Sequence, residues 1–261
     1  MTIPIYQVDA FTDKLFSGNP AAICPLDKWL SDEVMQHIAA ENNLSETAYL
    51  VNEGKQIHIR WFTPTHEVDL CGHATLAAAH VVKTILGFEA ALIPFFSPRS
   101  GALPVSINDS GYTLDFPSDS ISSAEYLPEF KRVFGKVPQE VLKGTSDYLL
   151  VFESEEDIRN LSPDFNELAK INTRGFIATA PGTSVDFVSR FFAPRYGINE
   201  DPVTGSAHTT LTPFWATRLK KTKLEALQLS KRGGRLTCEV KGDRILISGN
   251  AVLFLKGEIF V

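Results

Sequence analysis

A chain of 261 residues with 44% hydrophobic and 21% charged residues can build two medium-sized domains and has an ordinary globular composition. Its net charge of −6 argues against a nucleic-acid-binding surface, which would need a basic stripe. No apolar stretch approaches the ~20 residues of a membrane helix, the N-terminus lacks an export signal, and three scattered cysteines suggest no disulfide framework, so we expect a cytoplasmic protein that binds neither membrane nor nucleic acid.

Short strands dominate the predicted elements. Strand-type alternation or apolar runs occupy residues 3–9, 46–51, 57–63, 103–107, 112–116, 147–152, 175–180, 185–192, 235–240, 244–248 and 252–261. Helical patterning occupies 31–42 with Ser31 as N-cap, 73–86 ended by Gly87, 205–219, and more weakly 128–134 and 164–171. Many strands around a few helices predict an α+β fold and not a βαβ winding.

One motif occurs twice. Residues 60–64 read Arg-Trp-Phe-Thr-Pro and precede Cys-Gly-His-Ala at 71–74; residues 190–194 read Arg-Phe-Phe-Ala-Pro and precede Thr-Gly-Ser-Ala at 204–207. Each copy is typical of a strand, a proline-stiffened loop and a helix N-terminus. A repeat separated by about half the chain predicts two similar domains, 1–113 and 114–251, with strand 252–261 as a candidate addition to the first.

The two predicted helix ends indicate a binding site. A helix N-terminus has unpaired backbone N–H groups and a partial positive charge, so it attracts anions. Gly72 and Gly205 would let the backbone approach a ligand closely. We therefore predict a pocket for a carboxylate-bearing substrate where the two halves meet.

Glu46 is a candidate proton shuttle. It opens a predicted strand and precedes the apolar run Ala48-Tyr49-Leu50-Val51, so its side chain could point into an apolar site. Burial there would raise its pKa toward neutrality, as acid–base catalysis requires. The alternative is an exposed glutamate at a turn.

The first helix end carries His73 and Cys71. Beside a positive helix end, His73 is expected to stay neutral and to hydrogen-bond a substrate carbonyl or carboxylate; alternatively it caps its own helix. Cys71 is either a thiolate activated by the helix end or a small buried residue.

The second helix end carries Asp201, Thr204 and Ser206. Asp201 precedes a proline, which favours an extended backbone. Ser206 takes the slot of His73 in the repeat, although Thr204 or Ser206 could simply be the N-cap.

Metal and cofactor chemistry fit the sequence less well. His66, Asp69, Cys71 and His73 offer zinc ligands, but their spacing is irregular and the second copy supplies no matching ligands. Neither a dinucleotide-binding fingerprint nor a P-loop is present, and no Gly-x-Ser-x-Gly elbow supports a serine hydrolase. We expect no metal and no cofactor.

Five motifs together resemble one known family, the phenazine-biosynthesis PhzF-like isomerases, which are structurally related to diaminopimelate epimerase and proline racemase. The motifs are Val8-Asp9-Ala10-Phe11 with Gly18-Asn19-Pro20-Ala21-Ala22, Asn43-Leu44-Ser45-Glu46, Phe62-Thr63-Pro64 with Cys71-Gly72-His73-Ala74, Arg190-Phe191-Phe192-Ala193-Pro194, and Glu200-Asp201-Pro202-Val203-Thr204-Gly205-Ser206-Ala207. They follow the family's order over nearly the whole chain.

The resemblance implies two pseudo-symmetric domains, each a curved, mostly antiparallel, barrel-like sheet around a central helix, with the active site in the cleft between them. It makes Glu46 the catalytic acid/base and His73, Asp201 and Ser206 further catalytic residues. It also implies substrate binding by Asn19 and by the backbone amides of Gly72 and Gly205, and a homodimer. The related racemases use two cysteines, but the second motif has none, which disfavours a two-thiol mechanism.

Three functions follow as hypotheses. The first is a cofactor-independent isomerase or epimerase that moves a proton on a small carboxylated metabolite. The second is a non-catalytic protein that uses the same fold to bind a metabolite or a partner. The third, a metal-dependent hydrolase, has the weakest basis in the sequence.

Overall fold

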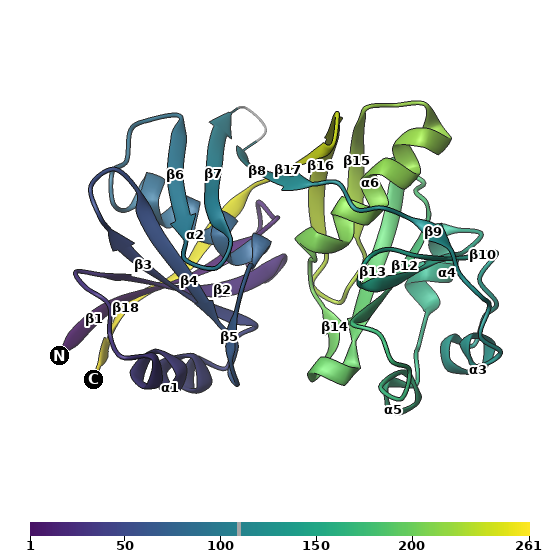
Figure 1. Cartoon of the computed structure of the whole chain (residues 1–261), viewed down its shortest axis with the longest axis horizontal. Coiled ribbons are helices and arrows are strands. Elements are labelled where there is room, and N and C mark those ends of the chain that lie inside the picture. Colours follow the sequence, from purple (N-terminus) through teal and green to yellow (C-terminus); the bar gives the residue numbers. More distant parts are fainter. Residues whose placement is uncertain (109–110) are drawn as a thin grey trace. The chain divides into compact units, whose positions relative to one another are not determined.

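The computed structural model describes residues 1–108 and 111–261 and divides into two compact units (Figure 1). Unit 1 consists of Met1–Asp115 and Ser248–Val261, and unit 2 of Phe116–Ile247. Unit 1 contains both chain ends, because β1 (Thr2–Ala10) pairs antiparallel with β18 (Ala251–Phe260). The domain boundary expected after residue 113 falls within β8 (Gly111–Pro117), the strand in which the chain passes from unit 1 to unit 2.

Unit 1 wraps strands around one buried helix. Its other strands are β2 (Asn19–Leu26), β3 (Glu46–Asn52), β4 (Ile57–Phe62), β5 (Glu67–Val68), β6 (Leu92–Ser97) and β7 (Gly101–Asn108). β2 is parallel to β3 and β4 is parallel to β6, whereas β1–β2, β3–β4, β4–β5, β6–β7 and β7–β8 are antiparallel. The central helix α2 (Gly72–Thr84) contacts β1, β2, β3 and β18. Its alanine-rich first turns are fully buried, since small side chains let the surrounding strands pack closely.

A second helix, α1 (Asp32–Asn42), contacts β3 and β4. Met35 and Ile38 on α1 pack in one apolar cluster with Tyr49 and Phe62. The predicted N-cap is confirmed, because the Ser31 hydroxyl accepts a hydrogen bond from the Val34 backbone N–H.

Unit 2 repeats the strand order of unit 1. Its strands are β9 (Ser122–Ser123), β10 (Glu140–Lys143), β11 (Asp147–Val151), β12 (Gly175–Pro181), β13 (Phe187–Ala193), β14 (Ile198–Asp201), β15 (Lys223–Gln228), β16 (Gly234–Lys241) and the main part of β17 (Arg244–Gly249). β11 is parallel to β12, β12 is antiparallel to β13, and β13 is parallel to β15, as in the series β2–β3–β4–β6. The central helix is α6 (Gly205–Leu219), which contacts β15 and β16.

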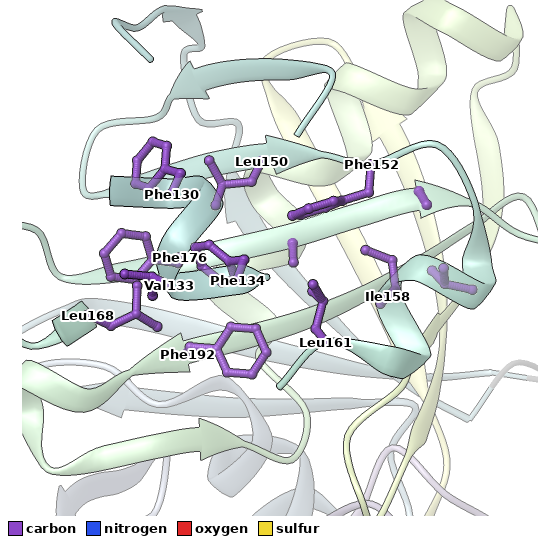
Figure 2. Packing of buried hydrophobic residues seen from close by; sticks show 13 residues of the cluster. Phe130, Val133, Phe134, Leu150, Phe152, Ile158, Leu161, Leu168, Phe176 and Phe192 are labelled. Carbon is purple, nitrogen blue, oxygen red and sulfur yellow. The ribbon is translucent and has the colours of Figure 1, made fainter. Parts of the chain in front are cut away.

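A phenylalanine-rich core supports unit 2 (Figure 2). Phe130, Phe134, Phe152, Phe176 and Phe192 are all at most 2% exposed and belong to one cluster. The short helices α3 (Glu129–Phe134), α4 (Glu155–Asn160) and α5 (Phe165–Leu168) contribute apolar side chains to it, and the 3-10 turn η1 (Pro194–Tyr196) follows β13. This core holds the strands that carry the second copy of the repeated motif.

The predicted segments all coincide with helices or strands, but the sequence prediction lacked several elements. The missing strands include β2, β6, β10, β14 and β15, and α4 and η1 were also missing. β2 and β6 contain internal prolines, which lowered the strand signal. α2 ends at Thr84, two residues before the predicted end at 86.

Candidate functional site

The first helix end is built around a buried histidine. α2 begins at Gly72, and Cys71 at the N-cap position makes no side-chain cap hydrogen bond. Thr75 instead donates its hydroxyl to the Cys71 carbonyl at 2.6 Å. His73, on the first turn, is only 5% exposed. A histidine this deeply buried needs polar partners, and three surround it.

Glu46 is the first of these partners. It opens β3, and the parallel register of β2 and β3 places it opposite Ala21. Its side chain is 12% exposed, and its Oε2 atom lies 3.2 Å from His73 Nε2. The side chain therefore points inward, unlike an exposed glutamate at a turn. Neither atom has a hydrogen bond of good geometry among the described residues, so both could bind a further group.

Asn19 and Cys71 contact the opposite nitrogen of the same ring. Asn19, fully buried at the start of β2, lies 3.2 Å from His73 Nδ1 through its side-chain amide, and Cys71 Sγ lies 3.5 Å from that nitrogen. Burial, aided by the charge of Glu46, raises the pKa of Cys71 to about 11. Cys71 is thus a thiol near neutral pH, and its interpretation as an activated thiolate was wrong.

The carboxyl group of Glu46 opposes the expected neutral state of His73. Burial lowers the pKa of His73, but Cys71 and Glu46 raise it more, so that it lies well above 6.5. Because Cys71 is a thiol, the Glu46 carboxylate supplies this effect near neutral pH. A carboxylate 3.2 Å away, shielded from water, outweighs the partial charge of a helix end. Asn19 presents its Nδ2 atom to Nδ1, which suits a neutral ring, and an imidazolium would require this amide to be rotated so that its oxygen faces Nδ1.

These residues do not form a common metal site. Ligand atoms of Glu46, Cys71 and His73 lie within 4.8 Å of one another. However, Cys71 faces Nδ1 and Glu46 faces Nε2, so an ion bound by all three would need the ring or its neighbours to shift. The other zinc candidates have different partners: His66 Nδ1 contacts Thr65, and Asp69 pairs with Arg99.

The second helix end has a different network. Thr204 occupies the N-cap position of α6, but its hydroxyl donates to Asp201 Oδ2 at 2.5 Å and does not cap the helix. Its backbone N–H donates to Gln228 Oε1 at 2.8 Å, and the Gln228 amide donates to the Asp201 carbonyl at 2.8 Å. Gln228 is 1% exposed and thus fixes the approach to the helix from β15.

Ser206 is exposed on the first turn of α6 and accepts a hydrogen bond from Arg174 Nη2 at 3.2 Å. Asp147, 3% exposed, accepts from Arg174 Nε at 2.9 Å and also from Nη2. The sequence prediction contained neither Arg174 nor Asp147, and it lacked Gln228. One feature of the sequence pointed to Arg174. It directly precedes a predicted strand, at the place where Ser45 precedes the strand that begins with Glu46.

The same ion pair braces the loop before each helix. Arg60 makes a two-bond pair with Glu67 at 2.7 and 2.8 Å, and Arg190 makes one with Glu200 at 2.6 and 3.0 Å. The repeated arginine of the sequence motif is therefore a structural residue in both units.

An apolar cavity of about 460 Å³ in unit 1 lies away from these residues. Val82 and Leu86, near the end of α2, line it together with Leu26 and Leu50. At about 1.5 Å per residue, the length of α2 separates this cavity from His73. We therefore assign the candidate site to the start of α2 and not to the cavity.

Comparison with known proteins gives a consistent result over the whole chain. Residues 8–257 match the family model PhzC-PhzF, described as phenazine biosynthesis-like protein. The chain is 51% identical over 259 residues to a protein of Pseudomonas aeruginosa named as an uncharacterized isomerase, covering 99% of each. A crystal structure of a PhzF-family protein from Enterococcus faecalis superimposes with a TM-score of 0.97 at 48% identity, covering 100% of each chain.

A more distant structure extends the likeness in fold. A predicted epimerase from Pseudomonas aeruginosa matches with a TM-score of 0.72 at 19% identity, covering 99% of each chain. The family resemblance and the expected α+β fold, with mostly antiparallel strands and few helices, are thereby confirmed. In the part of the chain that the structure describes, no helix is long and apolar enough to cross a membrane.

Proposed function

The chain belongs to the PhzC-PhzF family of phenazine biosynthesis-like proteins, and on this premise we propose that it is a cofactor-independent isomerase that moves a proton within a small carboxylated metabolite. Two relatives that are 51% and 49% identical in sequence are named as isomerases, and their names state no substrate. The proposal assigns the chemistry to Glu46 and the residues around it.

One observation carries the proposal: a buried carboxyl and a buried imidazole face each other with hydrogen-bonding capacity to spare. Glu46 Oε2 and His73 Nε2 lie 3.2 Å apart, and neither forms a hydrogen bond of good geometry within the described chain. Each atom is near its charged partner but makes no hydrogen bond of good geometry, so each can still bond to a ligand. This favours a binding and proton-transfer role over a purely structural one.

The proton would move in two steps. The Glu46 carboxylate accepts a proton from a carbon beside a carbonyl-like or unsaturated group: the C–H bond breaks, its electrons shift the double bond, and an O–H bond forms. Glu46 then returns the proton to a different carbon of the same molecule, or to the other face of the same carbon. A positioned acid/base contributes roughly 10²–10⁴-fold to such a reaction.

His73 would keep Glu46 ready to accept the proton. As an imidazolium it stabilises the ionised carboxylate, and its Nε2–H can donate to an oxygen on which negative charge develops. Asn19 would hold the ring through Nδ1, while the amide of Gly72 binds the substrate. In unit 2, Asp201, Ser206 and the amide of Gly205 are proposed to bind a polar substrate group at the start of α6.

The test is isotope exchange. Carboxylated metabolites are incubated with the protein in D₂O, and deuterium incorporation is read by mass shift. Once a substrate is found, Glu46→Gln should reduce incorporation by at least about 10²-fold, whereas Glu41→Gln, a matched change at an exposed glutamate of α1, should leave it unchanged.

Exchange retained in Glu46→Gln would remove Glu46 from its role. Tight binding of a metabolite by the unaltered protein without any exchange would instead support the alternative of a non-catalytic binder. Two further properties remain predictions, a homodimeric state, which light scattering would test, and a cytoplasmic location.

A further inference from the structure

Arg174 lies next to the position in unit 2 that corresponds to Glu46 in unit 1. The parallel register places Gly175 opposite Asp147, just as it places Glu46 opposite Ala21. Arg174 is thus one residue before the counterpart of Glu46. At the start of each strand, one side chain contacts the second residue of the central helix. Glu46 Oε2 lies 3.2 Å from His73 Nε2, and Arg174 Nη2 lies 3.2 Å from Ser206 Oγ.

The guanidinium of Arg174 is held on one side only. Buried Asp147 accepts from Nε and Nη2, and the Phe191 ring lies 5.6 Å from Cζ. Nη1 forms no hydrogen bond with any residue that the structure describes. The side chain is 39% exposed, so part of it can be reached from solvent. A guanidinium fixed in this way offers a ligand two N–H donors in a known direction.

The same contact determines what Ser206 can do. Since Ser206 Oγ accepts a hydrogen bond from Arg174, its own hydroxyl proton must point elsewhere. Among the described residues it has no acceptor, and the residue is exposed. Ser206 is therefore set up as a donor, beside the N-terminal amides of α6, which no side chain caps.

We propose that Arg174, held by Asp147, is a substrate-binding residue that positions Ser206 and makes this end of α6 selective for an anionic oxygen group such as a carboxylate. The inference rests on the proposed function, to which it adds the group that unit 2 recognises. Asp147 balances the formal charge of Arg174, so selectivity comes from the directed donors and not from a net positive charge.

Binding of a matched pair of probes tests this without any catalysis. Benzoate and benzamide have nearly the same shape, but only benzoate is an anion. Each is titrated into the full chain while the backbone amide signals of Ser206 and Ala207 are followed by NMR. The unaltered protein should bind benzoate more tightly than benzamide, and Arg174→Gln should weaken benzoate about tenfold with little change for benzamide.

Three variants make the result specific. Arg174→Lys keeps the positive charge but loses the planar set of guanidinium N–H donors, so it should retain part of the preference for benzoate over benzamide. The double variant with Arg174→Gln and Asp147→Asn avoids leaving a buried carboxylate unpaired, so loss of binding cannot be attributed to unfolding. Arg195→Gln, at an exposed arginine of η1, should behave as the unaltered protein.

Two results would overturn the proposal: an unaltered protein with no preference for benzoate, or a full preference kept by both Arg174→Gln variants. Because the readout is binding, a failure here is distinct from a failure of the isotope-exchange test. An isomerase without this selectivity, or this selectivity without exchange, can each be recognised.

Discussion

The starts of the two central helices share a scaffold but not a chemistry. Arg60 pairs with Glu67 before α2, and Arg190 pairs with Glu200 before α6. Each arginine also lies over the ring of the phenylalanine two residues later. Arg60 Cζ is 5.2 Å from the ring centroid of Phe62, and Arg190 Cζ is 5.0 Å from that of Phe192. A glycine then begins each helix. The repeated positions are thus those that shape the loop and the helix entry.

Apart from the shared glycines Gly72 and Gly205, the candidate site positions carry different side chains in the two units. By strand register, the residue of unit 2 that corresponds to Glu46 is Gly175, and the residue of unit 1 that corresponds to Asp201 is Val68. His73 is replaced by Ser206. The duplicated scaffold fixes the positions at each helix start, while the side chains at these positions vary independently.

The largest expected effect is a pH-dependent contribution to stability from a histidine of unit 2, which has the opposite sign to that of a histidine of unit 1. Burial lowers the pKa of His208, on α6, to about 4. At this histidine the folded protein binds fewer protons than the unfolded chain between about pH 6.5 and 4. The contribution of His208 to stability is therefore complete above this range and decreases as the pH falls through it. The loss should reach about 3 kcal/mol at the acid end. Denaturant unfolding at each pH, with His208→Gln lacking this dependence, measures it.

His73 provides the contrast of opposite sign. Its pKa is raised, so its contribution is complete below pH 6.5 and decreases as pH rises through the folded-state value. The difference in unfolding free energy between the unaltered protein and His73→Gln should shrink at alkaline pH. If both histidines shift stability in the same direction, the two helix ends are electrostatically alike and the comparison fails.

Next in size are the two bracing ion pairs. Arg190→Gln leaves a largely buried glutamate, Glu200, without its ion-pair partner and should cost about 1.5–3 kcal/mol, whereas Arg60→Gln leaves Glu67 paired with Arg99 and should cost less. Arg190 also donates to the backbone carbonyls of Ile158 and Leu161, which adds to its loss in chemical denaturation. An Arg60→Gln loss as large as that of Arg190→Gln would show that Arg99 does not support Glu67. Arg235→Gln, at a more exposed ion pair, is the control and should cost less.

The smallest effect concerns why unit 2 has no counterpart of Glu46. A Cβ at Gly175 would lie 2.4 Å from Phe191 Cζ and 3.1 Å from the Phe192 carbonyl oxygen. Gly175→Ala should destabilise the fold by about 1–2 kcal/mol through overpacking. Gly257→Ala, where a Cβ meets only ordinary contacts, should not. A neutral Gly175→Ala variant in thermal unfolding would mean that packing does not exclude a side chain from this slot.

Local patterns predicted much of this protein. The duplicated motif, the helices at 31–42 and 205–219 and the Ser31 cap follow from short-range spacing, and the structure agrees with them. Three of the candidate site residues, Asn19, Glu46 and His73, lie together, because the parallel register of β2 and β3 brings the first two beside the start of α2. Strands with internal prolines such as β2 escaped prediction, because their pairing is decided by neighbours distant in the chain.

The sequence by itself determined which residue types stand at the two helix starts and that the chain repeats. Only the tertiary structure decided the charge of His73, the thiol state of Cys71 and the inclusion of Arg174. The physical reason is that a side chain's protonation and partners depend on burial and on groups brought near by strand register, whereas periodicity along the chain reports only on local backbone structure.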